Sequence, residues 1–367
     1  MKGSSICLRF AAACVLALSL SLGVAACSGA SKSDPGGTSP DGQDSGDVDG
    51  GTNPGDDGGA TNPDAAILPS GPDTIQIVVE PTDKAQALLT AIQGAKSSVH
   101  MTMYLMNDKR FISALIAQKS AGRDVKVILN QTFPGGAGTN QATFSQLQGA
   151  GVSVAWAPST FTLTHQKTVL LDAAQAWIMT MNLETTSSNN REFLAVDTQA
   201  ADVAQAEAMF AADFANTTFT PAANENLLVA PFNARDKLVA LIQTAKTSVD
   251  IEGEELSDYK IVAALIAAKK AGRVVRVVLA DNAPTASQAN AVGQFKAASV
   301  PAVKVASPYI HAKAIVVDGA RAYVGSMNFT TGSLQYNREL GIITTNAASA
   351  AAIGVAIAKD FAAGTDL

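Results

Sequence analysis

Hydrophobic and polar residues divide the chain into three stretches of different character. An apolar run, residues 10–26, is followed by a polar stretch, residues 28–70, that consists mainly of Gly, Asp, Ser, Pro, Thr and Asn. Beyond it, apolar residues with helical spacing alternate with short runs rich in Val and Ile. Only this third stretch, residues 71–367, has the length and hydrophobic content for a large core.

The third stretch predicts the same order of elements twice. Each half begins with a helix and a strand, followed by a second helix that ends at Gly-Arg and by a β-branched strand. The expected ranges are helix 84–95, strand 98–105, helix 111–121 and strand 125–129 in the first half, and 235–245, 248–254, 261–271 and 274–279 in the second. Such alternation predicts the α/β class, with two α/β/α lobes, each a mixed and mostly parallel sheet flanked by helices. We expect the lobes at residues 71–222 and 223–367.

The two halves also match in sequence. The segment AKSSVHMTMYLMNDKRFISALIAQKSAGRDVKVIL, from Ala95, aligns without a gap with AKTSVDIEGEELSDYKIVAALIAAKKAGRVVRVVL, from Ala245. The offset of 150 positions falls to 146 further along, which indicates small loop deletions between otherwise matched halves. A repeat of this length indicates a duplicated domain rather than a solenoid.

A histidine and a lysine stand at the start of an apolar strand in each half. The first half reads LTHQKTVLLD and the second YIHAKAIVVD, so that His165 and Lys167 recur as His311 and Lys313. Side chains alternate along a strand, and each pair therefore lies on one face. One such pair alone would suit a solvated strand end. Two copies in register, which use two of the three histidines, favour a shared function and predict a pseudo-twofold active site at the lobe interface.

Further polar residues repeat behind each pair. They are the aspartates Asp172 and Asp318, the hydroxyls of Thr180 and Ser326, the carboxamides of Asn182 and Asn328, and the glutamates Glu192 and Glu339 of the segments NNREF and YNREL. Strand alternation places the aspartates on the opposite face from the His-Lys pairs. A glutamate that accepts a hydrogen bond from one imidazole nitrogen would fix the tautomer and leave the other nitrogen for chemistry.

These groups suit the oxygens of a phosphodiester. Ammonium and carboxamide groups supply hydrogen-bond donors, and the lysines add positive charge. One imidazole can attack phosphorus while the other protonates the departing oxygen and then deprotonates water. The scheme requires neither a metal nor a cofactor.

The doubled motif, His-x-Lys-x₄-Asp followed by Gly-Ser-x-Asn, resembles the phospholipase D superfamily across residues 75–361. The resemblance implies that His165 is the nucleophile and His311 the general acid. It also implies that the motif lysines and asparagines bind phosphate, that the hydroxyls of Thr180 and Ser326 lie with them, that the glutamates orient the histidines and that the aspartates are structural. The first copy departs from the pattern, because Met179 stands where the second has Gly325. We expect Met179 to narrow one side of the pocket or to change the substrate.

The N-terminal residues 1–27 resemble a bacterial lipoprotein signal. Two positive charges precede the apolar run, and Val-Ala-Ala-Cys resembles a lipobox, which implies cleavage before Cys27 and lipid attachment to its sulfur. An ordinary signal peptide and an uncleaved anchor remain open. Residues 28–70 are expected to form a disordered tether. The protein would then be exported and lipid-anchored to the bacterial cell envelope.

The acidic charge lies mainly outside the predicted lobes. The formal net charge is −6, but residues 28–70 contain eight Asp and one Lys, so that the lobes are nearly neutral. Nucleic-acid binders usually show a basic excess that these lobes lack. The three cysteines all precede residue 28, which excludes a disulfide or a thiolate metal site in the lobes.

The leading hypothesis is an enzyme that hydrolyses glycerophospholipids at a membrane surface to phosphatidic acid and a head-group alcohol, with no obligate protein partner. A metal-independent endonuclease remains the main alternative, with nucleic acid as its partner, because basic residues cluster at 269–276. A cardiolipin synthase-type transferase and a noncatalytic binding module are further alternatives. Of the remaining candidates, His100 is expected to pack in the structure, and the Gly-rich segment 134–140 to form a loop near the site entrance.

Overall fold

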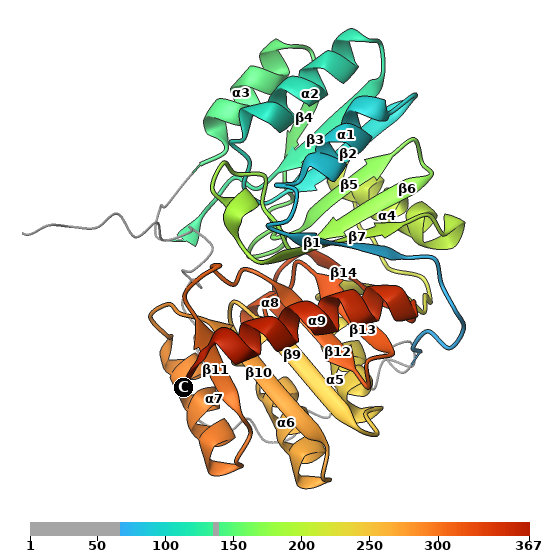
Figure 1. Cartoon of the computed structure of the whole chain (residues 1–367). Helices are drawn as coiled ribbons and strands as arrows, with labels where there is room; N and C mark the ends of the chain where they lie inside the picture. The colour runs from blue at the N-terminus through green and yellow to red at the C-terminus, as the bar shows by residue number, and fades with distance from the viewer. Residues whose placement is uncertain (1–66, 135–138) are drawn as a thin grey trace, which may run out of the picture. The chain divides into compact units, whose positions relative to one another are not determined.

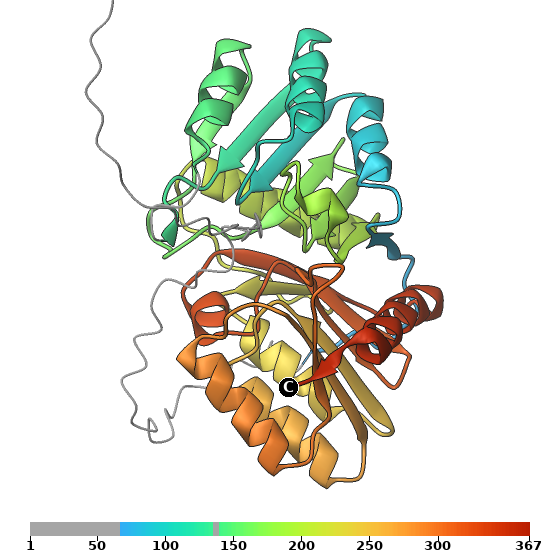
Figure 2. The same ribbon diagram turned by 60° about the vertical axis from the view of Figure 1, so that its left-hand side comes forward.

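The computed structural model describes residues 67–134 and 139–367, which form two α/β lobes (Figures 1 and 2). In the first lobe the strands follow one another in the order β1-β7-β6-β5-β2-β3-β4. They are β1 (Gln76–Glu80), β2 (Ser98–Met103), β3 (Asp124–Leu129), β4 (Ser153–Trp156), β5 (Lys167–Leu171), β6 (Gln175–Met179) and β7 (Glu192–Asp197).

The duplication predicted from the sequence is present in the second lobe, in which the order is β15-β11-β10-β9-β12-β13-β14-β8. These strands are β8 (Leu227–Ala230), β9 (Ser248–Gly253), β10 (Val274–Ala280), β11 (Ala302–Val305), β12 (Lys313–Val317), β13 (Arg321–Gly325), β14 (Glu339–Thr344) and β15 (Thr365–Asp366).

Each sheet is mixed, as predicted, but the expectation that most neighbouring strands run parallel is wrong. In the described residues only β2, β3 and β4 in one lobe, and β9, β10 and β11 in the other, are parallel neighbours. The remaining pairs are antiparallel, including those of β5 with β2 and of β12 with β9. The connections explain the difference, because helices join the parallel strands, whereas a short turn that joins β5 to β6, or β12 to β13, requires antiparallel neighbours.

Helices cover both faces of each sheet (Figure 1). The first lobe contains α1 (Gln86–Gly94), α2 (Lys109–Ser120), α3 (Gln141–Gly149) and α4 (Ala200–Phe214). The second contains α5 (Ala234–Gln243), α6 (Tyr259–Lys270), α7 (Ala286–Ala297), α8 (Thr331–Gln335) and α9 (Ala347–Ala363). The equivalent helices α2 and α6 begin at matching aspartates, Asp108 and Asp258, whose side chains accept hydrogen bonds from backbone N–H groups of the first turn.

The buried hydrophobic residues form three large clusters that follow this layering, and a small fourth cluster around Tyr104. One fills the space between the first sheet and α1, α2 and α3, and another fills the equivalent space between the second sheet and α5, α6 and α7. The third combines residues of both sheets with α4 and α9, and includes Ile178 and Phe193 of the first lobe and Val316 and Val324 of the second. The lobes therefore share a core, which gives their functional side chains a common rigid support.

No helix in residues 67–134 and 139–367 is long and apolar enough to cross a membrane. The predicted signal, the lipidation site Cys27 and most of the predicted tether lie outside the described residues.

Candidate functional site

The two His-Lys pairs lie at the starts of β5 and β12, where the backbone enters the sheet of each lobe. Lys167 and Lys313 are the first residues of these strands, and the histidines precede them by two positions. All four side chains are buried: His165 is 4% exposed and His311 1%, while both lysines are fully covered. Burial of two imidazoles and two ammonium groups is costly unless each has polar partners, and the surrounding residues supply them.

The Asn-Arg-Glu segments bring the two histidines together because each one pairs with the histidine strand of the other lobe. The backbone N–H of His165 donates to the carbonyl of Arg338 at 3.1 Å, and the N–H of Arg338 donates to the carbonyl of Leu163 at 2.8 Å. The second half repeats the arrangement, since the N–H of His311 donates to the carbonyl of Arg191 at 3.3 Å. These short stretches of backbone pairing fix the position of each histidine segment relative to the opposite lobe.

The crossed backbone pairing places each glutamate beside the histidine of the opposite lobe. Nδ1 of His165 lies 3.0 Å from Oε2 of Glu339, and Nδ1 of His311 lies 2.7 Å from Oε1 of Glu192. Both glutamates are fully buried. The sequence predicted that the glutamates would face the histidines, but it contained no signal that the pairs would cross between lobes.

Both glutamates are themselves held by hydroxyl groups. Thr180 donates to Oε2 of Glu192 at 2.5 Å, and Ser333 donates to Oε1 of Glu339, which also accepts from the carboxamide of Asn337 at 3.2 Å. The hydroxyl of Ser326 instead exchanges hydrogen bonds with the backbone of the residue after Glu339. Both hydroxyls are buried and bonded internally, and their expected contact with the substrate stays a prediction.

The lysines adopt the same position in each half. Nζ of Lys167 lies 2.8 Å from Nε2 of His165 and also donates to the carbonyl of that residue at 2.8 Å. Nζ of Lys313 donates to the carbonyl of His311 at 2.8 Å and to Oε2 of Glu254 at 3.0 Å. Both ammonium groups thus lie at the carbonyl of their histidine, and that of Lys167 also contacts the imidazole. An ammonium group in this place can meet a phosphate oxygen.

Asn182 and Asn328 lie at the same edge of their sheets as the histidines. They follow β6 and β13, which run antiparallel to β5 and β12, so that the ends of the former adjoin the starts of the latter. Both carboxamides are nearly buried, at 1% and 6% exposure. The structure therefore brings the predicted carboxamides to the edge that carries the imidazoles and the ammonium groups.

The motif aspartates lie at the far ends of the same strands. Asp172 accepts hydrogen bonds of 2.7 to 3.0 Å from the backbone N–H groups of residues 96–98 and from the hydroxyl of Ser97. Burial alone would raise the pKa of Asp172, but these donors lower it to about 2. Asp318 repeats the arrangement with residues 246–248. Both aspartates support the entry of β2 or β9, a structural role like the one that the resemblance implied.

The arginines of the Asn-Arg-Glu segments tie the lobes together. Arg338 donates to Asp213 of α4 at 2.8 Å, and Arg191 donates to Asp360 of α9 at 2.5 Å. All four side chains are buried, and each pair joins one lobe to the other. These contacts fix the segments that carry Glu192 and Glu339, so the arginines support the site from behind.

Two side chains at the centre of the site were missed by motif analysis. Tyr104 and Glu254 directly follow β2 and β9, at equivalent positions of the repeat, and both are buried. The ring of Tyr104 meets that of His165 edge-on with 4.5 Å between centroids, whereas Oε2 of Glu254 lies 3.5 Å from Nε2 of His311. The ungapped alignment of the halves could have identified them, because it sets a carboxylate against an aromatic residue at the end of an apolar strand.

The substitution of Met179 for the expected glycine affects the core rather than the pocket. Met179 is fully buried in the hydrophobic cluster under α1, α2 and α3, so the expectation that it narrows the pocket is wrong. In the second lobe the ring of Tyr323 occupies the matching space over Gly325 and Gly341. The two halves therefore fill one layer of the core with different side chains.

The third histidine has a structural environment. Nδ1 of His100 lies 2.7 Å from Glu207 of α4, Nε2 lies 3.3 Å from Asp124, and the ring stacks on Phe210. Burial lowers the pKa of His100, but the bond to Glu207 outweighs it and the pKa is raised. The tip of the Gly-rich loop, residues 135–138, lies outside the described residues, so its expected place at the site entrance stays a prediction.

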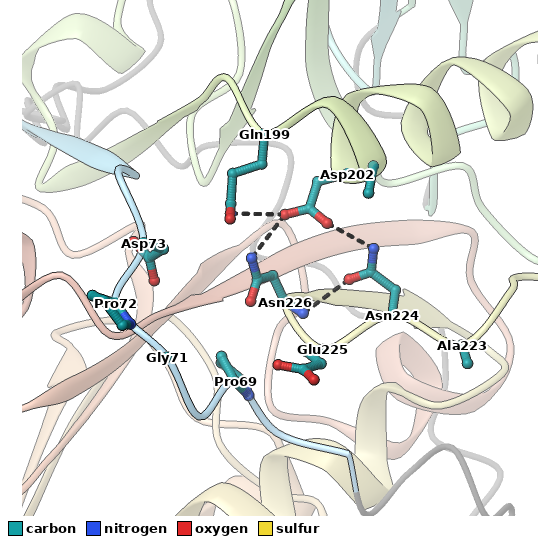
Figure 3. A pocket seen from close by; sticks show the side chains of 11 residues that line it. Pro69, Gly71, Pro72, Asp73, Gln199, Asp202, Ala223, Asn224, Glu225 and Asn226 are labelled. Atoms are coloured by element: carbon teal, nitrogen blue, oxygen red, sulfur yellow. Dashed lines mark hydrogen bonds between the residues drawn. The ribbon is translucent and has the colours of Figure 1, made fainter.

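A pocket that does not include the histidines lies between the segment before β1 and the connection between the lobes (Figure 3). At its wall the carboxylate of Asp202 accepts hydrogen bonds from Gln199, Asn224 and Asn226. These partners satisfy the carboxylate internally. Within residues 67–134 and 139–367, no cluster of histidine, aspartate and glutamate side chains could hold a metal ion.

Comparisons with known proteins agree with this architecture. The family described as "Cardiolipin synthase, PLD-like domain" matches residues 88–214 and 238–361, one match in each lobe. Phosphatidylserine synthase from Haemophilus influenzae Rd KW20 has a TM-score of 0.61 at 11% identity, over 82% of this chain and 89% of that chain. Polyphosphate kinase from Porphyromonas gingivalis has a TM-score of 0.61 at 15% identity, over 78% of this chain. This chain spans about half of the kinase, 46% of its length.

Nuc from Salmonella typhimurium, described as a phospholipase D family member, has 25% identity and a TM-score of 0.37, over 38% of this chain and 95% of that chain. A comparison with curated proteins finds no match. The family matches and the duplicated fold show that the chain belongs to the phospholipase D superfamily. Enzymes of this superfamily act on phosphodiesters.

Proposed function

We propose that this protein is a phospholipase D-type hydrolase that cleaves glycerophospholipids to phosphatidic acid and a head-group alcohol. The observation that carries the proposal is the crossed pair of imidazole-carboxylate contacts, in which Glu339 orients His165 and Glu192 orients His311. Nζ of Lys167 adjoins the imidazole of His165, and Nζ of Lys313 adjoins the backbone carbonyl of His311, so both half-sites hold a buried ammonium group. Such a site combines two imidazoles for nucleophilic and acid-base catalysis with fixed positive charge for a phosphate.

The reaction would proceed in two steps. Nε2 of His165 attacks phosphorus, the bond from phosphorus to the head-group oxygen breaks, and the proton on Nε2 of His311 passes to that oxygen. His311 then takes a proton from water as the water oxygen attacks phosphorus, the P–N bond breaks, and phosphatidic acid is released. Lys167, Lys313 and the two motif asparagines would hold the nonbridging oxygens. Each acid-base step contributes about 10²–10⁴-fold to the rate.

Three observations support a lipid substrate. The lobes are nearly neutral, whereas a nonspecific nuclease benefits from a basic groove, since phosphate contacts dominate its binding. The matching family is described by the name of a phospholipid synthase, and a structure with the same fold over most of both chains is named for phosphatidylserine. Lipid attachment at Cys27, proposed from the sequence, would also hold the site beside a membrane.

The test uses the full chain in EDTA with vesicles of phosphatidylcholine, phosphatidylethanolamine and phosphatidylglycerol, and separately with plasmid DNA. Release of head-group alcohol should be abolished in His165→Ala and His311→Ala. It should persist in His100→Asn, a matched control, because His100 is the remaining histidine and lies among structural partners.

Other outcomes would replace the proposal. DNA cleavage without lipid turnover would indicate the endonuclease. Preferred transfer of the phosphatidyl group to added glycerol would indicate a transferase of the cardiolipin synthase type. Vesicle binding that survives His165→Ala, with no turnover of lipid or DNA by the wild type, would indicate a binding module.

A further inference from the structure

The two halves of the site differ at one position. The ungapped repeat sets Tyr104 opposite Glu254, and both residues end the strand that carries them into the site. On the Tyr104 side, the ring contacts His165 and lies 4.9 Å from Nζ of Lys167. On the other side a carboxylate replaces the ring, and it reaches both Lys313 and the imidazole of His311. The second half-site thus contains a charge that the first lacks.

This difference places the two imidazoles in different surroundings of donors and acceptors. Nε2 of His165 lies 2.8 Å from the ammonium of Lys167, which has hydrogens to donate and no lone pair, so this nitrogen must accept. Its proton is then on Nδ1, facing Glu339. A neutral ring with a lone pair on Nε2 is the form required of a nucleophile.

His311 lies between two carboxylates instead. Glu192 faces Nδ1 at 2.7 Å and Glu254 faces Nε2 at 3.5 Å, and an ionised carboxylate can only accept hydrogen bonds. Glu254 is kept ionised by two donors, because Tyr309 donates to its Oε1 at 2.7 Å and Lys313 to its Oε2 at 3.0 Å. Two carboxylates therefore lie next to the ring of His311, one near each nitrogen, and their negative charge favours the imidazolium.

The other charges near His311 do not cancel this preference. The ammonium of Lys313 disfavours a second positive charge on the imidazole, but two carboxylates, Glu192 and Glu254, lie next to that ring and favour it. Arg191 lies in the next layer, where Asp360 neutralises it at 2.5 Å. Glu252 lies 4.0 Å from Arg191, and burial raises the pKa of Glu252 well above its usual range. The balance of charge at His311 remains negative, which stabilises the imidazolium.

We infer that Glu254 is a positioning residue that holds His311 in the protonated form and thereby reserves the general-acid role for the second lobe. The division of roles rests on the proposed phosphodiester chemistry, whereas the protonation itself is a property of the free protein. The structure thus supplies a physical reason for His165 to be the nucleophile, which the sequence supported only through a resemblance.

The protonation can be tested without substrate, by ¹⁵N NMR of the full chain labelled at histidine. The chain has three histidines, and His100→Asn, His165→Asn and His311→Asn assign the three signals. At pH 7 the wild type should show His311 as imidazolium and His165 as a neutral ring protonated on Nδ1. In Glu254→Gln the titration midpoint of His311 should fall by at least about one pH unit, a tenfold change in acid dissociation, because an opposite charge is lost.

Glu207→Gln is the matched control, since it removes the carboxylate beside His100 and should shift only that histidine. An unchanged midpoint of His311 in Glu254→Gln overturns the inference. So does a wild type whose His311 is neutral at pH 7, a result that needs no variant to fold. Neither result depends on turnover, so failure of this inference is distinct from failure of the proposed hydrolase.

Activity provides a second readout. The alkaline limb of the pH-rate profile in Glu254→Gln should move to lower pH by the same amount as the NMR midpoint, with activity retained on the acid side. Glu254→Asp should restore part of the shift. A uniform loss of activity at all pH values, without displacement of the limb, would instead assign Glu254 a purely structural role.

Discussion

Oε2 of Glu339 in the second lobe lies 3.0 Å from Nδ1 of His165 in the first. This contact fixes the tautomer and the ring orientation of the proposed nucleophile, and neither partner is accessible to solvent that could replace it. The site therefore requires both lobes at once, because each imidazole depends on a carboxylate from the opposite half.

The first prediction concerns this carboxylate. Glu339→Gln should lower kcat by about 10²–10⁴-fold, because an amide can present a donor to Nδ1 and stabilise the wrong tautomer, as in the Asp-to-Asn change of a serine protease triad. The measurement is steady-state turnover of the lipid substrate together with trapping of the phosphohistidine. Near-normal kcat in a folded Glu339→Gln protein would show that the contact is dispensable.

A second prediction concerns the buried pair that joins the lobes. Arg338 donates to Asp213 at 2.8 Å, and its guanidinium lies 4.3 Å from the ring of Phe161. Either Arg338→Met or Asp213→Asn should lower the free energy of unfolding by about 3–5 kcal/mol, because each leaves its buried partner without a counter-charge.

The double variant should lose less than the sum of the single losses, as expected for residues in direct contact. Urea unfolding of the wild type, both single variants and the double variant measures this coupling. The pair of Arg191 with Asp360 supplies the matched cycle, since it occupies the equivalent position with the lobes exchanged. Strict additivity in both cycles would mean that the pairs do not couple the lobes.

The third prediction is a pH dependence at the far end of the histidine strand. The pKa of Asp172 is lowered from 3.8 to about 2, so the carboxylate stabilises the fold above pH 4, and this stabilisation is lost as the pH falls through about 2. Asp172→Asn should therefore cost about 1 kcal/mol at neutral pH, similar to the loss of a helix cap.

The difference between wild type and Asp172→Asn should shrink between pH 4 and pH 2. Thermal unfolding followed by circular dichroism across this range is the measurement, and Asp318→Asn is the matched variant, because the pKa of Asp318 is also lowered to about 2. A constant difference from pH 7 to pH 2 would contradict the role of the ionised carboxylate. Neither variant should alter the residues at the histidines, so kcat at 25 °C should be unchanged.

Much of the architecture follows from local patterns in the sequence. Periodicity and self-alignment predict the duplication, the helices α1, α2, α5 and α6 and the strands β2, β3, β9 and β10, which begin and end within a few residues of their predicted bounds. The strands that open the lobes, β1 and β8, were not predicted. The direction of neighbouring strands could not be predicted in this way, because the periodicity of hydrophobic residues does not show which strands pair. The antiparallel pairing of β5 with β2 joins segments about 70 residues apart, and Asp172 at the end of β5 bonds to the backbone before β2, a contact that local patterns do not show.

The sequence predicted which residues belong to the site but not which of them contact one another. Repetition identified the histidines and glutamates, whereas the crossing of Glu192 to His311 depends on how the lobes meet. Glu254 was missed because a single carboxylate in a strand has no motif of its own. The hydrogen bond from Thr180 to Glu192 was also not predictable, because the sequence does not show which partner a buried hydroxyl has.

The last prediction concerns the packing of Tyr323 against Gly325 and Gly341 in the core of the second lobe. The three atoms nearest to a Cβ added at Gly341 all belong to the side chain of Tyr323, whereas one added at Gly325 would also lie 2.6 Å from the backbone of Gly341. Gly341→Ala should cost about 1–3 kcal/mol of stability by overpacking. Most of that loss should disappear in the background of Tyr323→Leu, because the smaller side chain removes the collision.

Gly325→Ala should not be relieved by Tyr323→Leu, since the backbone atoms it meets stay in place. Urea unfolding of the two alanine variants in both backgrounds measures the difference. Equal relief at both positions would show that the backbone of β13 and β14 shifts to make room. In the first lobe, Met179 and Leu194 are paired on adjacent strands, and both side chains pack in the hydrophobic core of that lobe. Relief at Gly341 alone would therefore mean that Gly341 makes room for the ring of Tyr323, whereas Gly325 is required by the close approach of the neighbouring backbone.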